Sequence, residues 1–336
     1  MPKQFLVSLV VMLWPVIACW SQEANEFLDR RPLTNFSSET ISPEEFVENN
    51  FLNFSVAPRL CRERKILSAN LRQSISELAL QEWAYFGFNF VDEFSEEYSE
   101  PIGLNRAGAG RDWLDAKTAE RVTSSIAGYW ASTKDGSWIV QEQNISWLVD
   151  IDNYDWDAPW SASFISWIIC ELGLTEEEFS RSIAHHHYID QAIRDRLNGE
   201  NTPSAYRAYR VGEKPLNAGD LLCRARRSQY LALEERISDL GIPARTHCDI
   251  LISIEDNYAL VIGGNIRDAV SLKRIPLERL ANGNILSIGS PYRKIFVHLS
   301  LKSDTEITIK ELDIFKNIID FINASDELKN RFNFFS

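Results

Sequence analysis

The chain has 336 residues, of which 45% are hydrophobic and 25% are charged, and its formal net charge is −13. This is an ordinary globular composition, without repeats or low-complexity segments, and it is long enough for one large domain or two small ones. An acidic chain without a basic stripe argues against nucleic acid as a partner.

Residues 1–19 have the pattern of an export signal. The apolar run over 5–18 is too short to span a bilayer, which is typical of a signal-peptide core. It ends at Cys19 in Val-Ile-Ala-Cys, which is similar to a bacterial lipobox, whose cysteine becomes the lipidated first residue. The alternative to lipidation is ordinary cleavage of the signal peptide a few residues later, near Ser21. We expect an exported, periplasmic protein held to the outer membrane by a lipid on Cys19, because Trp20 rather than Asp follows the cysteine.

The segments before the centre of the chain differ in polarity and in hydrophobic period. Residues 20–58 are polar and have no sustained period, which indicates a tether between the anchor and a folded domain. Apolar residues spaced by three or four predict a helix over 59–94 that closes near Gly87, and another helix over 119–130. Residues 131–156 carry three tryptophans, which we interpret as packing rather than as a groove for a sugar or peptide.

Residues 157–173 predict a loop that enters a buried helix. Their apolar side chains recur with a helical period, Pro159 suits the start of the helix, and Gly173 suits its end. Ser161 then lies in the first turn, where free backbone N–H groups and the helix dipole can stabilise a developing oxyanion. The alternative is that Ser161 only caps the helix, although Phe164 in place of Glu or Gln leaves no capping box.

A further helix is expected over 176–197, and it contains three consecutive histidines, His185, His186 and His187. Neighbouring positions on a helix point about 100° apart, so these three side chains cannot bind one ion from a regular helix. We therefore predict no metal site.

The second half of the chain predicts antiparallel strands. Residues 245–255 alternate cleanly between apolar and polar side chains, with His247 and Asp249 on the same face. A polar turn separates this strand from a second one over 258–265, which predicts a hairpin. If the loop comprises residues 255–257, His247 lies directly opposite Asn265, and opposed residues share a face and can touch.

That pairing is what a histidine base needs. A polar group that bonds one ring nitrogen fixes the tautomer and frees the other nitrogen to take a proton from a nucleophile. A serine hydroxyl requires such a base because it does not ionise readily. The residues suggest Ser161 as nucleophile, His247 as general base and Asn265 as the group that orients the base. Asp249 is the alternative orienting group, although it lies two places along the same strand.

Three motifs together resemble one family. The sequence Pro-Trp-Ser-Ala-Ser-Phe-Ile-Ser-Trp at 159–167 is similar to the nucleophile motif of the NlpC-type and CHAP-type cell-wall hydrolases, with Ser161 in place of their cysteine. With Glu82-Trp83 and Gly128-Tyr129-Trp130, it resembles the bacterial domain of unknown function 2272 family.

The resemblance implies an α+β, papain-like fold over 59–302 and a peptidase or amidase that acts on peptidoglycan or another peptide without a cofactor. It also maps a His, Tyr and Ile pattern onto His185, Tyr188 and Ile189, and so implies that His185 and Tyr188 line a substrate cleft together with Trp160. Because a serine replaces the cysteine, the alternative is an inactive fold that binds peptidoglycan or acts as an envelope scaffold lipoprotein.

The remaining features concern the end of the chain and the cysteines. Residues 270–302 continue the sheet, Asp220 is interpreted as a turn former, and residues 303–336 are expected to form a C-terminal amphipathic helix. Besides Cys19, four cysteines remain, which permits disulfides with three possible connectivities in an exported protein: Cys61, Cys170, Cys223 and Cys248. Cys248 as a displaced nucleophile is disfavoured, because its side chain should point away from that of His247.

Overall fold

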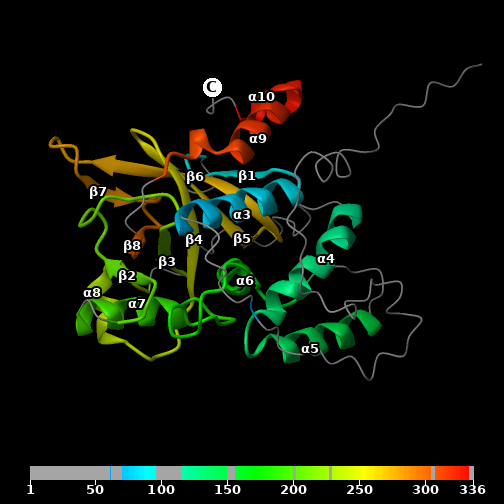
Figure 1. Ribbon diagram of the computed structural model, residues 1–336, viewed down its shortest axis with the longest axis horizontal. Helices are drawn as coiled ribbons and strands as arrows, with labels where there is room; N and C mark the ends of the chain where they lie inside the picture. The colour runs from blue at the N-terminus through cyan, green and yellow to red at the C-terminus, as the bar shows by residue number, and fades with distance from the viewer. Residues whose placement is uncertain are drawn as a thin grey trace, which may run out of the picture.

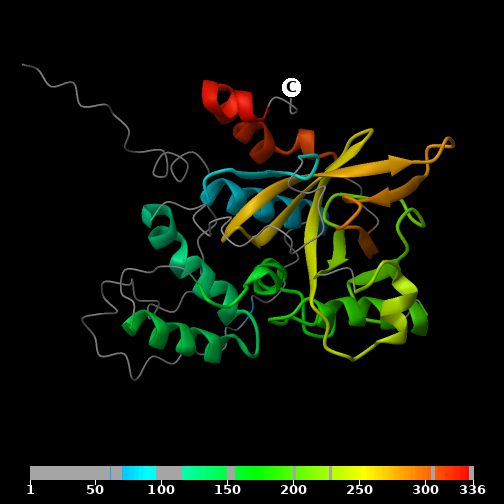
Figure 2. The same cartoon turned by 180° about the vertical axis from the view of Figure 1, so that it is seen from behind.

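An open, mostly antiparallel sheet of eight strands forms the centre of the computed structural model, and eight helices surround it (Figures 1 and 2). The structure describes residues 61, 70–95, 116–149, 156–199, 202–226, 229–303 and 307–332, to which these counts refer. The expected export signal with Cys19 and the tether over 20–58 lie outside the described residues. The expected α+β class is confirmed, and its papain-like form stays a prediction.

The sheet runs in the order β1-β6-β5-β4-β3-β8-β2, with β7 paired to β6. Only β1 and β6 form a parallel pair among the described strands. The strands are β1 (Asn89–Asp92), β2 (Tyr206–Tyr209), β3 (Leu221–Ala225), β4 (Thr246–Ile254), β5 (Tyr258–Ile266), β6 (Ala269–Arg279), β7 (Ile285–Ile288) and β8 (Ile295–Leu301).

The helices are α3 (Leu71–Tyr85), α4 (Ala116–Ala131), α5 (Gly136–Val149), α6 (Ser161–Glu171), α7 (His186–Asn198), α8 (Leu233–Ser238), α9 (Asp313–Asn323) and α10 (Asp326–Arg331). Helix α3 precedes the first strand, α4 to α7 lie between β1 and β2 in the sequence, α8 lies between β3 and β4, and α9 and α10 follow the last strand. Helices α3 and α6 both contact the central strands β4 and β5, α4 packs on α6, and α9 packs on α3 (Figure 1). None of the described helices is long and apolar enough to cross a bilayer.

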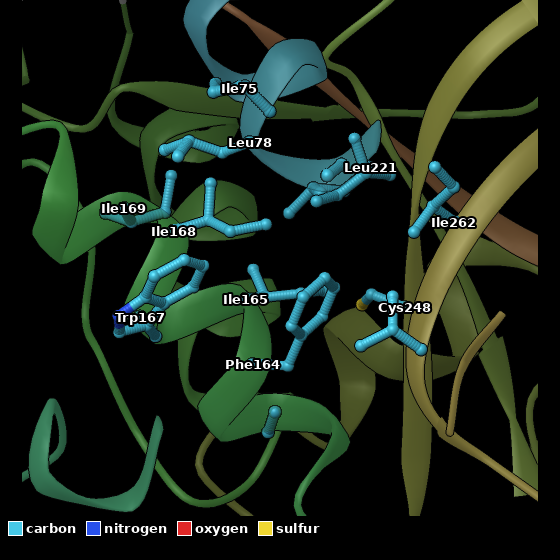
Figure 3. Packing of buried hydrophobic residues seen from close by; sticks show 14 of the residues in the cluster. Ile75, Leu78, Phe164, Ile165, Trp167, Ile168, Ile169, Leu221, Cys248 and Ile262 are labelled. Carbon is cyan, nitrogen blue, oxygen red and sulfur yellow. The ribbon is translucent and has the colours of Figure 1, made fainter. Parts of the chain in front are cut away.

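Helix α6 is held in the middle of the main hydrophobic core. Phe164, Ile165 and Ile168 are almost wholly buried, between α3 and the sheet residues Cys248 and Ile262 (Figure 3). Full burial of one such side chain contributes about 1.5–3 kcal/mol, so the apolar face strongly fixes the position of the helix. The first turn of α6, which begins at Ser161, is therefore placed by packing along the whole helix.

The β4–β5 hairpin forms as expected, but its loop is longer. Ile254 pairs with Ala259 rather than with Tyr258, and a bulge between Leu251 and Ser253 then compensates. Beyond the bulge Ile250 pairs with Ile262, which is the register that the shorter loop predicts. An extra residue in one strand thus cancels the extra residue in the turn.

Several other predicted boundaries are wrong. The helix expected over 59–94 does close next to Gly87, whose φ of +88° suits a glycine, but the end of that range forms the strand β1 instead of helix. The helix expected over 176–197 begins only at His186. Helix α5 arises inside 131–156, where only packing tryptophans were expected. The single helix expected within 303–336 is a 3₁₀ turn followed by α9 and α10.

The four cysteines form two disulfides, Cys61–Cys170 and Cys223–Cys248. The second joins directly paired residues of β3 and β4, and the first ties Cys61 to the end of α6. The half-cystine at position 248 is thereby removed as a candidate nucleophile.

This connectivity is the first testable prediction. We expect a non-reducing peptide map of the protein to contain the peptide pairs 61 with 170 and 223 with 248. A disulfide that closes a loop of about 100 residues restricts the unfolded chain and stabilises the fold by about 4.7 kcal/mol in the chain-entropy model. Reduction removes this restriction, so it should lower the free energy of unfolding by several kcal/mol. A map with the cysteines paired in another way contradicts the prediction.

Candidate active site

Ser161 begins α6 with its side chain turned toward an imidazole. The N-cap position belongs to Trp160, and no side chain caps the helix. Ser161 is 2% exposed, and its Oγ lies 2.7 Å from Nε2 of His185. The alternative in which Ser161 only caps the helix is therefore wrong, because its hydroxyl bonds a histidine and not the backbone.

His185 is positioned just before α7 and is buried. Its Nδ1 accepts a hydrogen bond of 3.2 Å from the backbone N–H of Cys248, and the hydroxyl of Tyr188 also contacts Nδ1. Burial lowers the pKa of His185 well below its usual value, and the nearby His247 and Arg226 lower it further. The ring is consequently neutral at pH 7.

These contacts decide the tautomer of His185. A backbone N–H can only donate, so Nδ1 of the neutral ring carries no proton, and the proton lies on Nε2. Nε2–H therefore donates to Oγ of Ser161, and the hydroxyl of Tyr188 donates to Nδ1. In this state His185 holds the serine oxygen but cannot accept its proton.

His247 lies close to His185 on β4, with ring centroids 5.1 Å apart. Its Nε2 is 2.9 Å from Oδ1 of Asp249, so Nε2–H donates a hydrogen bond to the carboxylate, and Nδ1 of the neutral ring is the unprotonated nitrogen. Burial lowers the pKa of His247 to about 4, against an opposing effect of Asp249. The partner of His247 is thus the alternative orienting group, Asp249, rather than Asn265.

Gly263 on β5 makes room for this pair. A Cβ atom at this position would lie 2.1 Å from Oδ1 of Asp249 and 3.2 Å from Nε2 of His247. Any larger residue would displace the carboxylate. Gly263, which lies within the second predicted strand, therefore permits the contact between His247 and Asp249.

Asp249 also belongs to a buried network of charges. Nζ of Lys273 donates to Oδ2 of Asp249 at 2.5 Å, and Nη1 of Arg224 donates to both carboxylate oxygens of Glu93, at 2.8 and 3.1 Å. Burial alone raises the pKa of Asp249, but the charge of Lys273 and the hydrogen bond from His247 lower it far below its usual value. The carboxylate remains ionised beside the neutral His247.

A cavity of about 730 Å³ brings these elements together. Ser161, His185, His247 and Asn265 all line it, so four of the residues predicted for the site share one cavity. The charged residues in the rest of the wall are mostly basic, with one acid, Glu93, against Arg224, Arg226, Arg245, Arg267, Lys273 and Arg293. The described residues contain no group of three or more His, Cys, Asp or Glu placed to hold a metal ion.

Two predicted substrate contacts are not in this wall. Trp160 is 1% exposed and packs between the rings of Phe86 and Tyr129, each 5.7 Å away. Tyr188 is also 1% exposed and stacks on Phe179. Neither residue is among those that line the cavity, and their contact with a substrate stays a prediction.

Sequence reasoning missed the charged network of Glu93, Arg224 and Lys273. The available signal was weak: Lys273 interrupts an apolar strand, and a lysine is almost never fully buried unless it is paired. Glu82, which the sequence marked only through the family resemblance, is 1% exposed and accepts a hydrogen bond from Tyr129.

The buried histidines make stability depend on pH, which is the second prediction. The folded-state pKa of His247, about 4, lies below the ordinary value of 6.5, so the unfolded chain binds a proton more readily between these values. The contribution of the neutral His247 to the free energy of unfolding is therefore fully present above pH 6.5, and it is lost as the pH falls toward 4. Between pH 7 and pH 5 we expect His247 alone to lower the free energy of unfolding by about 2 kcal/mol, measured by urea titration.

The comparison variant for this prediction is His247→Gln, which should lose that part of the pH dependence. His187→Gln, which changes an exposed histidine next to the site, is the matched control and should retain it. An unchanged pH dependence in His247→Gln contradicts the assigned shift.

Comparison with known proteins identifies one family. The model of a family described as an uncharacterized protein conserved in bacteria, DUF2272, matches residues 118–301. No curated protein and no solved structure matches the chain. The match includes α6, both histidines of the site and the β4–β5 hairpin.

Proposed function

The chain belongs to the DUF2272 family of uncharacterized bacterial proteins, and from the geometry of the site we propose that it is a hydrolase that cleaves an amide bond with Ser161 as nucleophile. One observation carries the proposal. The hydroxyl of Ser161 lies at the start of α6, 2.7 Å from the imidazole of His185, in a cavity that also holds His247 bonded to a buried carboxylate. A nucleophile, a base and an orienting group are the parts that such a reaction needs.

The roles follow from the tautomers. His185 donates from Nε2 to Oγ of Ser161 and so directs the hydroxyl hydrogen into the cavity. His247 offers Nδ1 as the proton acceptor, directly or through one water, and Asp249 stabilises the imidazolium that forms. The free N–H groups in the first turn of α6 supply donors for the oxyanion.

The cell envelope is the proposed location. The signal and lipobox pattern of residues 1–19 supports export, and two disulfides are what an oxidising compartment permits. Peptidoglycan as substrate rests on the resemblance of the 159–167 motif to the NlpC-type and CHAP-type hydrolases. A papain-like fold is proposed on the same ground, with α6 packed on the strand that carries His247.

An inactive envelope scaffold is the second candidate, and two observations favour it. His185, the histidine in contact with Ser161, is in the tautomer that donates to it. The other histidine, His247, has a pKa lowered to about 4 by burial and is therefore a weak base. A serine without an effective base is a poor nucleophile.

The test is incubation of the full chain with soluble peptidoglycan fragments, followed by mass spectrometry. If the protein is a hydrolase, we expect products that have gained one water at an amide bond. If it is an inactive scaffold, we expect the fragments to bind without being cleaved. His247→Gln should lose hydrolysis, while His185→Gln should keep part of it, because a glutamine amide still donates to Ser161. Full activity in His247→Gln would remove His247 from the mechanism.

A further inference from the structure

One part of the cavity wall carries positive charge that no acid of the described chain balances. Glu93 and Asp249 are already paired with Arg224 and Lys273. Arg226 and Arg245 also line the cavity, and neither has an ion pair within the described ranges. These two arginines therefore present their charge to whatever enters.

The two arginines are held next to each other by the sheet. Ala225 at the end of β3 pairs with Thr246 at the start of β4, and Arg226 N–H donates to the carbonyl of Arg245 at 2.7 Å in the next step of this ladder. Like charges directly opposite each other destabilise an antiparallel pair. Both arginines are exposed to solvent, and the pKa of Arg226 is lowered by partial desolvation and by the charge of Arg245, in agreement with this proximity.

A third group at the same place lacks a partner. Thr246 is 5% exposed and lines the cavity, and its buried Oγ1 has no hydrogen-bond partner in the structure. A buried hydroxyl without a partner costs about 1–3 kcal/mol, so it is usually satisfied by a ligand or a water. It lies beside the arginine pair along the chain.

We infer that Arg226, Arg245 and Thr246 form a subsite for a carboxylate of the peptide substrate, next to the Ser161 centre. A carboxylate matches two guanidinium groups and one hydroxyl donor, and it relieves the repulsion between the arginines. The inference rests on the proposed function for the identity of the substrate. It restricts the substrate class to acidic peptides, although the chain as a whole has a net charge of −13.

The experiment measures binding, so it remains informative if no hydrolysis occurs. The probes are acetyl-Ala-Glu, with two carboxylates, and its diamide acetyl-Ala-Gln-amide, titrated into the Ser161→Ala protein by calorimetry. We expect the acid to bind at least about 10-fold more tightly than the diamide, with a preference that weakens as salt is added. Arg226→Gln combined with Arg245→Gln should abolish the preference.

Arg331→Gln is the matched control, because Arg331 is an exposed arginine of α10. It should leave the preference unchanged, and a thermal scan checks that each variant is folded. Equal binding of acid and diamide, or a preference that survives in the double variant, overturns the inference. Inorganic phosphate is the third probe, and phosphate binding without binding of acetyl-Ala-Glu also overturns it.

Discussion

Replacing Ser161 with alanine is expected to lower the rate of amide hydrolysis by about 10³-fold or more, because the variant lacks the proposed nucleophile. The fold should survive. Ser161 does not cap α6, and loss of its hydrogen bond with His185 costs only about 1 kcal/mol. Steady-state kinetics on a peptidoglycan fragment and a thermal scan measure the two effects separately.

Ser163→Ala is the matched control for this variant. Ser163 lies two residues further along the same helix, is fully buried, and its hydroxyl has no hydrogen-bond partner in the structure. Its replacement should leave turnover unchanged. Ser161→Cys should retain hydrolysis, since a thiol at a helix N-terminus gains thiolate character. Turnover by Ser161→Ala equal to that of the wild type refutes the nucleophile assignment.

Asp220→Ala is expected to have the largest effect on stability, about 3–5 kcal/mol in the free energy of unfolding, because it leaves a buried cation unpaired. Asp220 is fully buried. Its carboxylate accepts a hydrogen bond of 2.6 Å from Arg72 and lies 2.7 Å from Nε2 of His298. Backbone N–H groups of Asn217 and Leu301 also donate to it. The carboxylate therefore joins α3, the turn before β3, and β8.

Urea titration at pH 7 measures the loss. Asp313→Ala is the control, because the Asp313–Lys316 pair is exposed and should contribute less than about 1 kcal/mol. A loss in Asp220→Ala no larger than that of the control would show that the buried pair does not stabilise the fold. Arg72→Met should cost less than Asp220→Ala, since the remaining Asp220 carboxylate keeps its contact with His298 and the N–H donors of Asn217 and Leu301.

Local patterns predicted the parts of the site that depend on nearby residues. The apolar period over 157–173 and the alternation over 245–255 gave α6 and β4 correctly, because a helix face and a strand face are each defined by neighbours in the chain. These two elements carry Ser161 and His247 into the same cavity. The hairpin register at Ile250 and Leu251 also agreed, although through a bulge that no local pattern indicates.

Long-range contacts decided the rest. The partner of Ser161 is His185, whose orientation is set by the N–H of Cys248, 63 residues away in the chain. Asp249 reaches His247 because Gly263 on the neighbouring strand has no side chain. Asp220 was visible in the sequence only as a turn former, and its buried contact with Arg72 joins residues 148 positions apart.

The amino-acid sequence by itself determined the α+β class, the central apolar helix, the hairpin and the residues available for chemistry, because hydrophobic period and turn composition act over a few residues. Only the tertiary structure decided which histidine contacts the serine, which tautomer it adopts, which cysteines pair and which charges are buried together. Those choices depend on desolvation and on hydrogen-bond partners from distant segments, and neither is encoded in the spacing of one segment.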